Sequence, residues 1–231
     1  MPNKSTFITI PDSVLPNHIG FIIDGNRRWA KENNKRMFDG HAQGIENVKK
    51  TIQNCIDLNI KNITFFALSI ENWKRNETEI SNLMKIFKNA FDDKDFLENK
   101  DANIKFIGNL SMLPKELQLK TEQTNLKEPK IDAKIDVNIA ISYSGQDEII
   151  RAHEKAKKEN LSFIECLDLK NKLPIDLIIR TGGEHRISNF MLWDMAYSEL
   201  FFTPKKWPDF DYHALCEAVT WYINRNRRYG I

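Results

Sequence analysis

Three short segments of the sequence combine arginines, glycines and carboxylates in a way that suits the binding of phosphate. They are DGNRR at 24–28, SIENWKR at 69–75 and RTGGEHR at 180–186. Guanidinium groups offer paired donors that match phosphate oxygens, and glycine lets backbone N–H groups approach a ligand closely. Each charge-assisted hydrogen bond is worth about 1.5 to 3 kcal/mol, so a few of them can hold a diphosphate firmly. The three segments therefore predict a site for a phosphorylated ligand.

Asp24 stands at the start of the first segment, and its charge needs an explanation. A carboxylate that faces a polyanion is repelled unless a cation lies between them, and oxygen ligands together with phosphate favour Mg2+. Taken singly, Asp24 could instead cap a helix that begins near Asn26, and Arg180 or Arg186 could form an ordinary ion pair. Taken together, the segments favour a diphosphate held by arginines, a helix N-terminus and magnesium. The chain contains neither a GxGxxG dinucleotide motif nor a GxxxxGK[ST] phosphate loop.

Six short apolar runs, with helix-length segments between most of them, predict the elements that position these residues. The runs are 18–23, 63–68, 104–107, 137–142, 177–179 and 200–202. Such an alternation predicts an α/β fold with a mainly parallel sheet. Ligands of open α/β sheets bind beyond the carboxyl ends of the strands. The segments that follow the first, second and fifth runs should therefore meet at one edge of the sheet.

Apolar residues at helical spacing predict an amphipathic helix after the first run and another after the second. The first face consists of Ile45, Val48, Ile52, Cys55 and Ile56, and the second of Ile80, Leu83, Met84, Phe87 and Phe91. Core packing is the ordinary explanation of both faces. The polar segment 109–134, with scattered leucines, predicts a surface helix and loop.

Length and composition indicate one domain, spanning residues 1–231, with a substantial core. Lys and Arg number 34 against 32 for Asp and Glu, and this net charge of +2 gives no reason to expect a nucleic-acid binder of the bulk electrostatic kind. Cys55, Cys166 and Cys216 lack the paired spacing of a zinc site and should be reduced core residues. The sequence shows no secretory signal pattern and no run of ~18 apolar residues. It predicts a cytoplasmic protein that touches a membrane at most peripherally.

Five blocks of the chain resemble signatures of the cis-prenyltransferase family, and specifically of undecaprenyl diphosphate synthases. They are HIGFIIDGNRRWA, GHAQG, LSIENWKR, DLIIRTGGEHRISNFMLWDMAYSELFFTPKKWPDF and NRRYG, in the family's order and spacing between about 18 and 230. The resemblance implies the fold of that family, a central, mostly parallel six-stranded sheet flanked by helices, with a hydrophobic tunnel. It also implies a homodimer that uses Mg2+.

The resemblance assigns roles to residues of all three segments. As catalytic residues it implies Asp24, which holds Mg2+ on a substrate diphosphate, and Asn72, a proposed proton acceptor. As metal-associated residues it implies Asp24, His185 and Glu199, the last reaching over from the dimer partner. The implied substrate-binding residues are Gly25, Asn26, Arg27, Arg28, Trp29, Arg36, His41, Ser69, Ile70, Glu71, Trp73, Arg75, Arg180, Arg186, Ile187, Ser188, Arg228 and Gly230. Of these, Arg180, Arg186, Ile187 and Ser188 match the isopentenyl diphosphate site, and Arg228 and Gly230 act across the dimer interface.

The chain departs from the family pattern at three positions. Arg27 replaces a glycine that many bacterial members have, and Gln146 stands where an arginine is common. Met37 occupies the place of an arginine often found before the GH histidine, with Arg36 one place earlier. Because an amide is a poor base, a diphosphate oxygen or a relay through His41 is as good a proton acceptor as Asn72.

The resemblance implies condensation of isopentenyl diphosphate with an allylic diphosphate, farnesyl diphosphate being the expected primer. The expected product is undecaprenyl diphosphate, the lipid carrier of cell-wall synthesis. A shorter cis-prenyl product, a non-catalytic subunit of a two-component prenyltransferase and a phosphoester hydrolase are the alternatives. Beside the small residue Ala67, the apolar residues Leu68, Leu83, Met84 and Phe87 are candidates for the tunnel wall.

Overall fold

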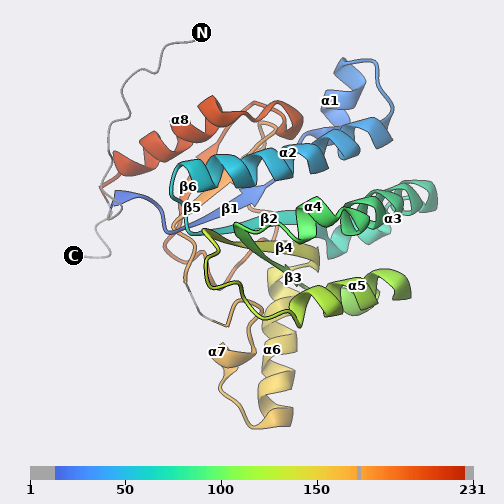
Figure 1. Ribbon diagram of the computed structural model, residues 1–231, viewed down its shortest axis with the longest axis vertical. Coiled ribbons are helices and arrows are strands. Elements are labelled where there is room, and N and C mark those ends of the chain that lie inside the picture. Colours follow the sequence, from blue (N-terminus) through green and yellow to red (C-terminus); the bar gives the residue numbers. More distant parts are fainter. Residues whose placement is uncertain (1–13, 171–172, 227–231) are drawn as a thin grey trace.

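Within residues 14–170 and 173–226, which the computed structural model describes, six parallel strands form one central sheet (Figure 1). The strands are β1 (His18–Ile22), β2 (Asn62–Ser69), β3 (Ala102–Ile107), β4 (Ile135–Tyr143), β5 (Leu177–Arg180) and β6 (Glu199–Phe202). They lie in the order β3-β4-β2-β1-β5-β6, and all five neighbouring pairs are parallel. The predicted strands and the parallel α/β sheet are confirmed.

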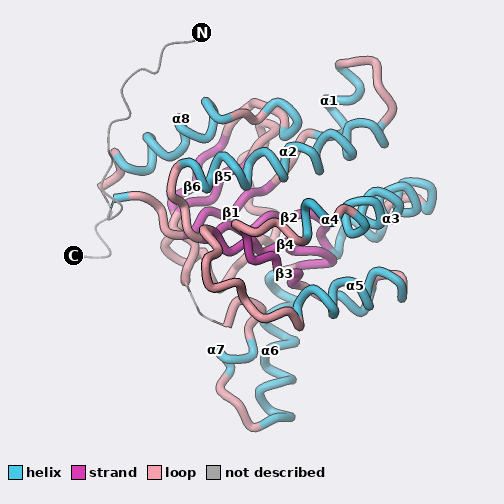
Figure 2. The backbone as a smooth tube through the Cα atoms, in the orientation of Figure 1, coloured by secondary structure: helices cyan, strands magenta, loops and turns pink. Residues whose placement is uncertain are grey.

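Helices flank this sheet, as expected for a parallel sheet that is buried on both faces (Figure 2). The α-helices are α1 (Asn26–Glu32), α2 (Met37–Asp57), α3 (Glu77–Asp92), α4 (Lys94–Leu97), α5 (Lys115–Asn125), α6 (Gly145–Glu159), α7 (Phe163–Cys166) and α8 (Tyr212–Ile223). Short 3-10 helices are η2 (Ile70–Lys74), η3 (Leu110–Met112) and η4 (Trp207–Asp209). Figure 2 shows α6 and α7 extending away from the body that the other helices form around the strands.

The two faces of the sheet pack against different parts of the chain. Successive residues of a strand point to opposite faces, and in β1 the side chains of Ile19 and Phe21 enter one core while Ile22 enters another. The first core also contains buried residues of α2, α3, α5 and α8. The second contains Phe190 and Met191 from the long connection between β5 and β6. That connection is therefore anchored directly on the sheet, close to the ends of β1 and β5.

The two predicted helix faces do form core. Val48, Ile52 and Cys55 of α2 are buried, and so are Leu83 and Phe87 of α3. The polar segment 109–134 does contain a helix and a loop, but it is more than a surface feature. Leu113 and Leu117 are buried against the sheet in this segment, so α5 contributes an inner face to the core. Cys55 and Cys166 are buried and Cys216 is half-buried, all three as free thiols.

No helix among the described residues is long and apolar enough to cross a bilayer.

Besides the apolar cores, the molecule buries a cluster of acids at the start of α6. The hydroxyl of Tyr143 donates to the carboxylate of Glu148, and Arg151 holds Asp168 through two hydrogen bonds of 3.0 and 2.8 Å. Burial and the charge of Asp168 raise the pKa of Glu148 to about 7.

Asp194 belongs to the same cluster and is 3% exposed. Its Oδ2 atom has no hydrogen-bond partner within the described part of the chain. Burial, reinforced by the negative charge of Asp168, raises the pKa of Asp194 to about 6. Above that pH the native state carries an ionised carboxylate in a poorly solvated place.

We expect Asp194→Asn to stabilise the protein at pH 7.5 and to have little effect near pH 4. Between about pH 4 and 6 the Asp194 carboxyl binds more protons in the native state than in the unfolded state, so its contribution to the free energy of unfolding falls as pH rises. The variant does not titrate there, and its advantage should grow to the order of 2 kcal/mol. Urea unfolding of both proteins at several pH values measures this difference. A pH-independent difference would contradict the prediction.

Candidate active site

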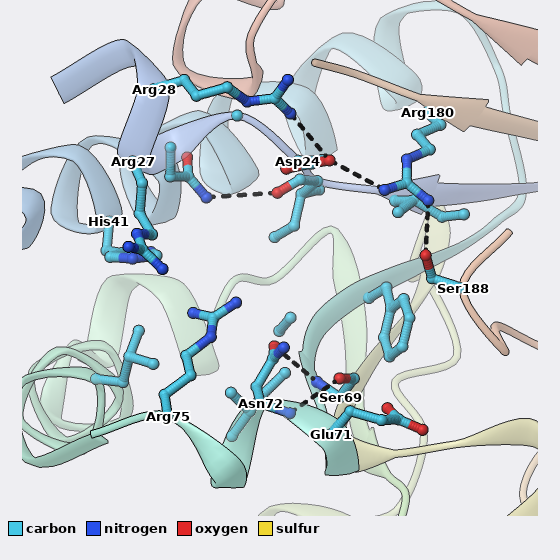
Figure 3. Close-up of a pocket in the computed structure, with 18 of the residues that line it drawn as sticks. Asp24, Arg27, Arg28, His41, Ser69, Glu71, Asn72, Arg75, Arg180 and Ser188 are labelled. Atoms are coloured by element: carbon cyan, nitrogen blue, oxygen red, sulfur yellow. Dashed lines mark hydrogen bonds and ion pairs between the residues drawn. The ribbon is translucent and has the colours of Figure 1, made fainter. Parts of the chain in front are cut away.

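A cavity of about 1110 Å³ opens at the carboxyl ends of β1, β2 and β5 (Figure 3). These three strands are neighbours in the sheet, so the segments that follow them meet although they are far apart in the sequence. The cavity is lined by Ile22, Ile23, Asp24, Gly25, Asn26, Arg27, Arg28, Lys31, Lys35, Met37, His41, Phe66, Ala67, Leu68, Ser69, Glu71, Asn72, Arg75, Leu83, Arg180, Arg186, Ser188 and Asn189. The predicted convergence of the three polar segments is therefore present.

Asp24 lies just beyond β1 and is contacted by two arginines. Its Oδ2 atom accepts a hydrogen bond of 3.0 Å from Arg180 and lies 3.1 Å from a guanidinium nitrogen of Arg28 (Figure 3). The N-cap of α1 is Gly25, and no side chain caps that helix. The alternative that Asp24 serves as a helix cap is therefore wrong.

Arg180 links Asp24 to the loop between β5 and β6. Its Nη1 atom donates to the backbone oxygen of Arg186 at 2.5 Å and to the hydroxyl of Ser188 at 2.8 Å. The Arg180 side chain is only 4% exposed, and its Nε atom has no partner among the described residues. Arg180 does form an ion pair, but it forms it with the carboxylate of the cavity itself. Arg186 in turn is paired with Glu184 at 2.5 Å.

Glycines let the first segment and α2 approach each other at this site. Gly25 has a φ of 109°, a left-handed conformation, and a Cβ atom there would lie 2.9 Å from the Cβ atom of Lys206. A Cβ atom on Gly40 would lie 2.4 Å from the backbone oxygen of Asn26, and one on Gly44 would lie 2.6 Å from its Oδ1. The glycines of the GHAQG block therefore allow α2 to pass directly behind the polar end of α1.

Two further arginines of the cavity wall, Arg27 and Arg75, share one buried carboxylate, and the ring of His41 lies near them. Glu79 is 6% exposed, and its Oε1 atom accepts from Arg75 at 2.9 Å and lies 3.4 Å from Arg27. Burial, together with the positive charges of Arg75 and Arg27, lowers the pKa of His41 to about 4. The ring is therefore neutral at pH 7. Its Nε2 atom is buried without a partner in the described structure.

The segment after β2 forms the opposite wall of the cavity. Ser69 and Asn72 cap η2 reciprocally: the Ser69 hydroxyl accepts from the Asn72 backbone N–H, and the Asn72 Oδ1 accepts from the Ser69 backbone N–H, each at 3.3 Å. Glu71 points toward Asn189, with 3.4 Å between its Oε1 atom and the amide nitrogen of Asn189. The caps fix the turn that presents Glu71 and Asn72 to the cavity.

Several predicted site residues do not line the cavity. Arg36 pairs with Asp39 through contacts of 2.7 and 3.0 Å, and this interaction holds its side chain at the exposed start of α2. The indole N–H of Trp29 donates to Asp209, and that of Trp73 donates to Ser142. Ile70 is half-buried in η2, and Ile187 packs against the second core. Arg228 and Gly230 lie outside the described residues.

His185 and Glu199 lie at opposite ends of β6. The ring of His185 stacks on Phe202, the last residue of that strand, whereas Glu199 is its first residue and accepts from Arg225. Three residues of strand span about 10 Å, so the two side chains start from well-separated positions in one chain. Among the described residues, no group of three or more His, Cys, Asp or Glu could hold a metal.

The donor set nevertheless fits Mg2+ that arrives with a phosphorylated ligand. Such ions are commonly bound through one or two carboxylates together with phosphate oxygens and water, and Asp24 supplies one carboxylate at the cavity. Asp24 follows β1 and His185 follows β5, so both lie at the edge of the sheet where the parallel strands have their carboxyl ends. The family resemblance implies that Glu199 joins them from a second chain.

Sequence reasoning missed four polar or flexible residues of the cavity wall, namely Lys31, Lys35, Met37 and Asn189. The two lysines that closely follow the DGNRR segment were a usable signal, because they add positive charge beside the predicted phosphate site. Nothing in the sequence indicated Asn189. Of the apolar candidates, Ala67, Leu68 and Leu83 line the cavity, while Met84 and Phe87 pack in the first core instead.

The chain is similar to proteins of one known family. The family model of undecaprenyl diphosphate synthases matches residues 22–230. A ditrans,polycis-undecaprenyl-diphosphate synthase of Vibrio cholerae, described as specific for (2E,6E)-farnesyl diphosphate, is 40% identical over 96% of this chain and 94% of its own length.

Two solved structures share the fold. The lavandulyl diphosphate synthase of Lavandula x intermedia, in complex with dimethylallyl diphosphate, superposes with a TM-score of 0.85 at 32% identity, over 95% of this chain and all of its own. A probable undecaprenyl diphosphate synthase of Campylobacter jejuni gives 0.78 at 31% identity, over 94% and 99% of the two chains. The family match over most of the chain and the identity with these relatives show that the chain belongs to the undecaprenyl diphosphate synthase family of prenyltransferases.

Proposed function

We propose that the protein condenses isopentenyl diphosphate with an allylic diphosphate, farnesyl diphosphate being the primer, to give undecaprenyl diphosphate for cell-wall lipid carrier synthesis. One observation carries the proposal. In the described structure, seven cationic side chains but only two carboxylates, Asp24 and Glu71, line a cavity whose wall also includes Ile23, Phe66 and Leu83. The cations are Arg27, Arg28, Lys31, Lys35, Arg75, Arg180 and Arg186. Strong positive charge beside apolar surface suits two diphosphates with hydrocarbon tails.

In the proposed reaction, the bond between the allylic carbon and its diphosphate oxygen breaks, and the terminal alkene carbon of isopentenyl diphosphate bonds to that carbon. A proton then leaves the attacking molecule, which gives the new cis double bond. Arg28 and Arg27 would hold the departing diphosphate, while Arg180, Arg186 and Ser188 hold the isopentenyl diphosphate. Magnesium bound with a diphosphate would neutralise charge on the leaving group, and Asp24, with His185 and Glu199 of a second chain, would hold it.

The proton acceptor follows from the protonation state of the groups at hand. His41 is neutral because its pKa is lowered to about 4, so it can relay a proton that a charged imidazole could not take. The Asn72 amide oxygen already accepts from Ser69 and is a weak base. We therefore favour a diphosphate oxygen as the acceptor, with His41 as a relay.

We further propose a homodimer of single-domain chains, 1–231, in the cytoplasm, with peripheral membrane contact when the product is released. Each enclosed CH2 contributes about 0.8 kcal/mol, so a long product would be held by the apolar wall and would leave slowly. A cavity of about 1110 Å³ exceeds the usual size of small-ligand sites, which supports a product longer than the primer.

The test is an assay of the purified chain with radiolabelled isopentenyl diphosphate, farnesyl diphosphate and MgCl2, with products resolved by mass spectrometry. We expect a C55 product, and the signal should vanish with EDTA. Shorter products would favour a short-chain cis-prenyl diphosphate synthase. No product would favour a non-catalytic subunit, and release of phosphate without chain growth would favour a phosphoester hydrolase.

Lys31 and Lys35 should contribute to the capture of the allylic diphosphate. Both line the cavity at its rim, where flexible point charges attract a polyanion without orienting its reacting atoms. We expect the double variant K31Q/K35Q to raise the KM for farnesyl diphosphate about five- to tenfold and to change kcat by less than about twofold. The salt dependence of kcat/KM should also weaken.

The matched control for this prediction is Arg36→Gln. It removes a neighbouring positive charge that is directed to Asp39 and not to the cavity. If K31Q/K35Q and R36Q raised the KM for farnesyl diphosphate equally, only the overall positive charge of residues 31–36 would matter.

A further inference from the structure

Asn189 lines the cavity and joins three segments of the chain that are distant in the sequence. Its Nδ2 atom donates to the hydroxyl of Ser144 at 2.6 Å and lies 3.4 Å from the Oε1 atom of Glu71. Its Oδ1 atom accepts from the backbone N–H of Gln146 at 3.1 Å. Both ends of the amide therefore have defined partners, and these partners fix its orientation.

The same residue satisfies the start of α6. The first N–H groups of a helix lack partners inside the helix and are usually satisfied by the side chain of the N-cap residue. In α6 the N-cap is Ser144, which makes no such bond. Instead, the backbone oxygen of Asn189 accepts from the N–H of Gly145 at 2.7 Å, and its side chain accepts from that of Gln146. Asn189 caps α6 from a different segment of the chain.

The backbone around Asn189 has an uncommon conformation. Ser188, Asn189 and Met191 have φ values of 52°, 64° and 45°, a left-handed region that residues other than glycine rarely adopt. Such a conformation persists only where the surroundings fix it. On the buried side the ring of Phe190 stacks on Phe66 with 4.9 Å between centroids. On the other side, Asn189 is bound to the start of α6 and Ser188 is bound to Arg180.

These contacts determine the position of Ser188. Its hydroxyl accepts from Arg180, and it immediately precedes Asn189, whose backbone oxygen and side chain are both bound to α6. Arg186 lies two residues before Ser188, and its backbone oxygen accepts from Arg180 as well. A shift of Asn189 would thus displace the atoms that are assigned to isopentenyl diphosphate.

We propose that Asn189 is a positioning residue. By capping α6 it fixes the loop that presents Ser188 and Arg186, and it thereby determines the affinity for isopentenyl diphosphate and not that for the allylic diphosphate. The proposal rests on the function proposed above. It makes no claim that Asn189 itself contacts either substrate.

Two variants of the full chain test the proposal. N189G retains the left-handed backbone and the backbone cap but removes the amide. N189D retains the acceptor for Gln146 but places an oxygen where Nδ2 faces Glu71, which introduces repulsion between carboxylates. For both we expect the Kd and KM for isopentenyl diphosphate to rise about tenfold, with those for farnesyl diphosphate within about twofold of wild type. Isothermal titration gives the Kd and the condensation assay gives the KM.

Asn160 provides a matched control in the same helix. It is the C-cap of α6, is exposed, and has a φ of 54°. N160G therefore removes an asparagine side chain from the other end of α6 without touching the cavity wall, and it should leave both substrates unaffected.

Unchanged binding of isopentenyl diphosphate in N189G would overturn the proposal, and so would an equal loss of both substrates. If N189D does not fold, which circular dichroism would show, N189G decides alone. Failure of the positioning role is distinguishable from failure of the proposed function, because the latter would appear as absent condensation in the wild type.

Discussion

Replacing Asp24 by alanine is expected to lower the rate of condensation by about three orders of magnitude while the protein stays folded. Loss of one preorganised group that stabilises transition-state charge typically costs about 10² to 10³ in kcat, and Asp24 is also proposed to hold the metal. Condensation assays at saturating substrate measure the loss, and thermal unfolding measures stability.

The fold should tolerate this change because the substitution keeps the backbone hydrogen bonds of Asp24. Its backbone oxygen accepts from the hydroxyl of Thr181 at 2.7 Å and from the N–H of Trp207 at 3.0 Å, and alanine retains both. The side chain is 32% exposed and caps no helix. Alanine also removes the Asp24 partner of the nearly buried Arg180, so we expect the free energy of unfolding to fall by about 1 to 3 kcal/mol, which a folded domain can tolerate.

Asp39→Ala is the control for Asp24→Ala. Asp39 also pairs with an arginine near the start of a helix, but it lies outside the cavity. It should leave the rate unchanged. A rate for Asp24→Ala within a few-fold of wild type would show that its carboxylate takes no part in the chemistry.

Arg180→Lys is expected to lower kcat/KM about 100-fold, chiefly through a higher KM for isopentenyl diphosphate. Lysine keeps the charge but offers a single point of contact, so it cannot bridge Asp24, Ser188 and the Arg186 backbone as the guanidinium group does. Because Arg180 is nearly fully buried, the unmade hydrogen bonds should also lower the free energy of unfolding by about 1 to 3 kcal/mol.

Arg151→Lys separates the two effects of that change. Arg151 likewise makes a two-point contact with a carboxylate, that of Asp168, but lies away from the cavity. It should lose stability and keep both KM values. If Arg180→Lys behaved in the same way, Arg180 would be a structural residue alone.

The arginines of the cavity are held by the protein's own carboxylates. Asp24 contacts Arg28 and Arg180, and Glu79 contacts Arg27 and Arg75. This pairing explains how so many positive charges can share one wall without strong mutual repulsion. A bound diphosphate would share or replace these partners, so D24N and R180K should be non-additive in a double-mutant cycle.

Much of the fold could be predicted from the sequence because its signals are local. A parallel strand that is buried on both faces needs a continuous apolar run, and all six runs are strands. The polar residues after those runs identified most of the cavity wall, from Asp24 through Ser69 to Arg180. Parallel strands place their carboxyl ends together, so the convergence followed from the fold class alone.

Tertiary structure alone decided the order β2-β1-β5, which makes the three polar segments neighbours. It also decided which side chains of one hairpin face the ligand: Arg36 turns to Asp39, whereas Lys31 and Lys35 reach the cavity. Asn189 caps a helix whose first residue lies more than forty positions away in the chain. The physical reason is the same in each case. Periodicity and motif spacing report only a residue's near neighbours, and such contacts between distant segments leave no pattern in either.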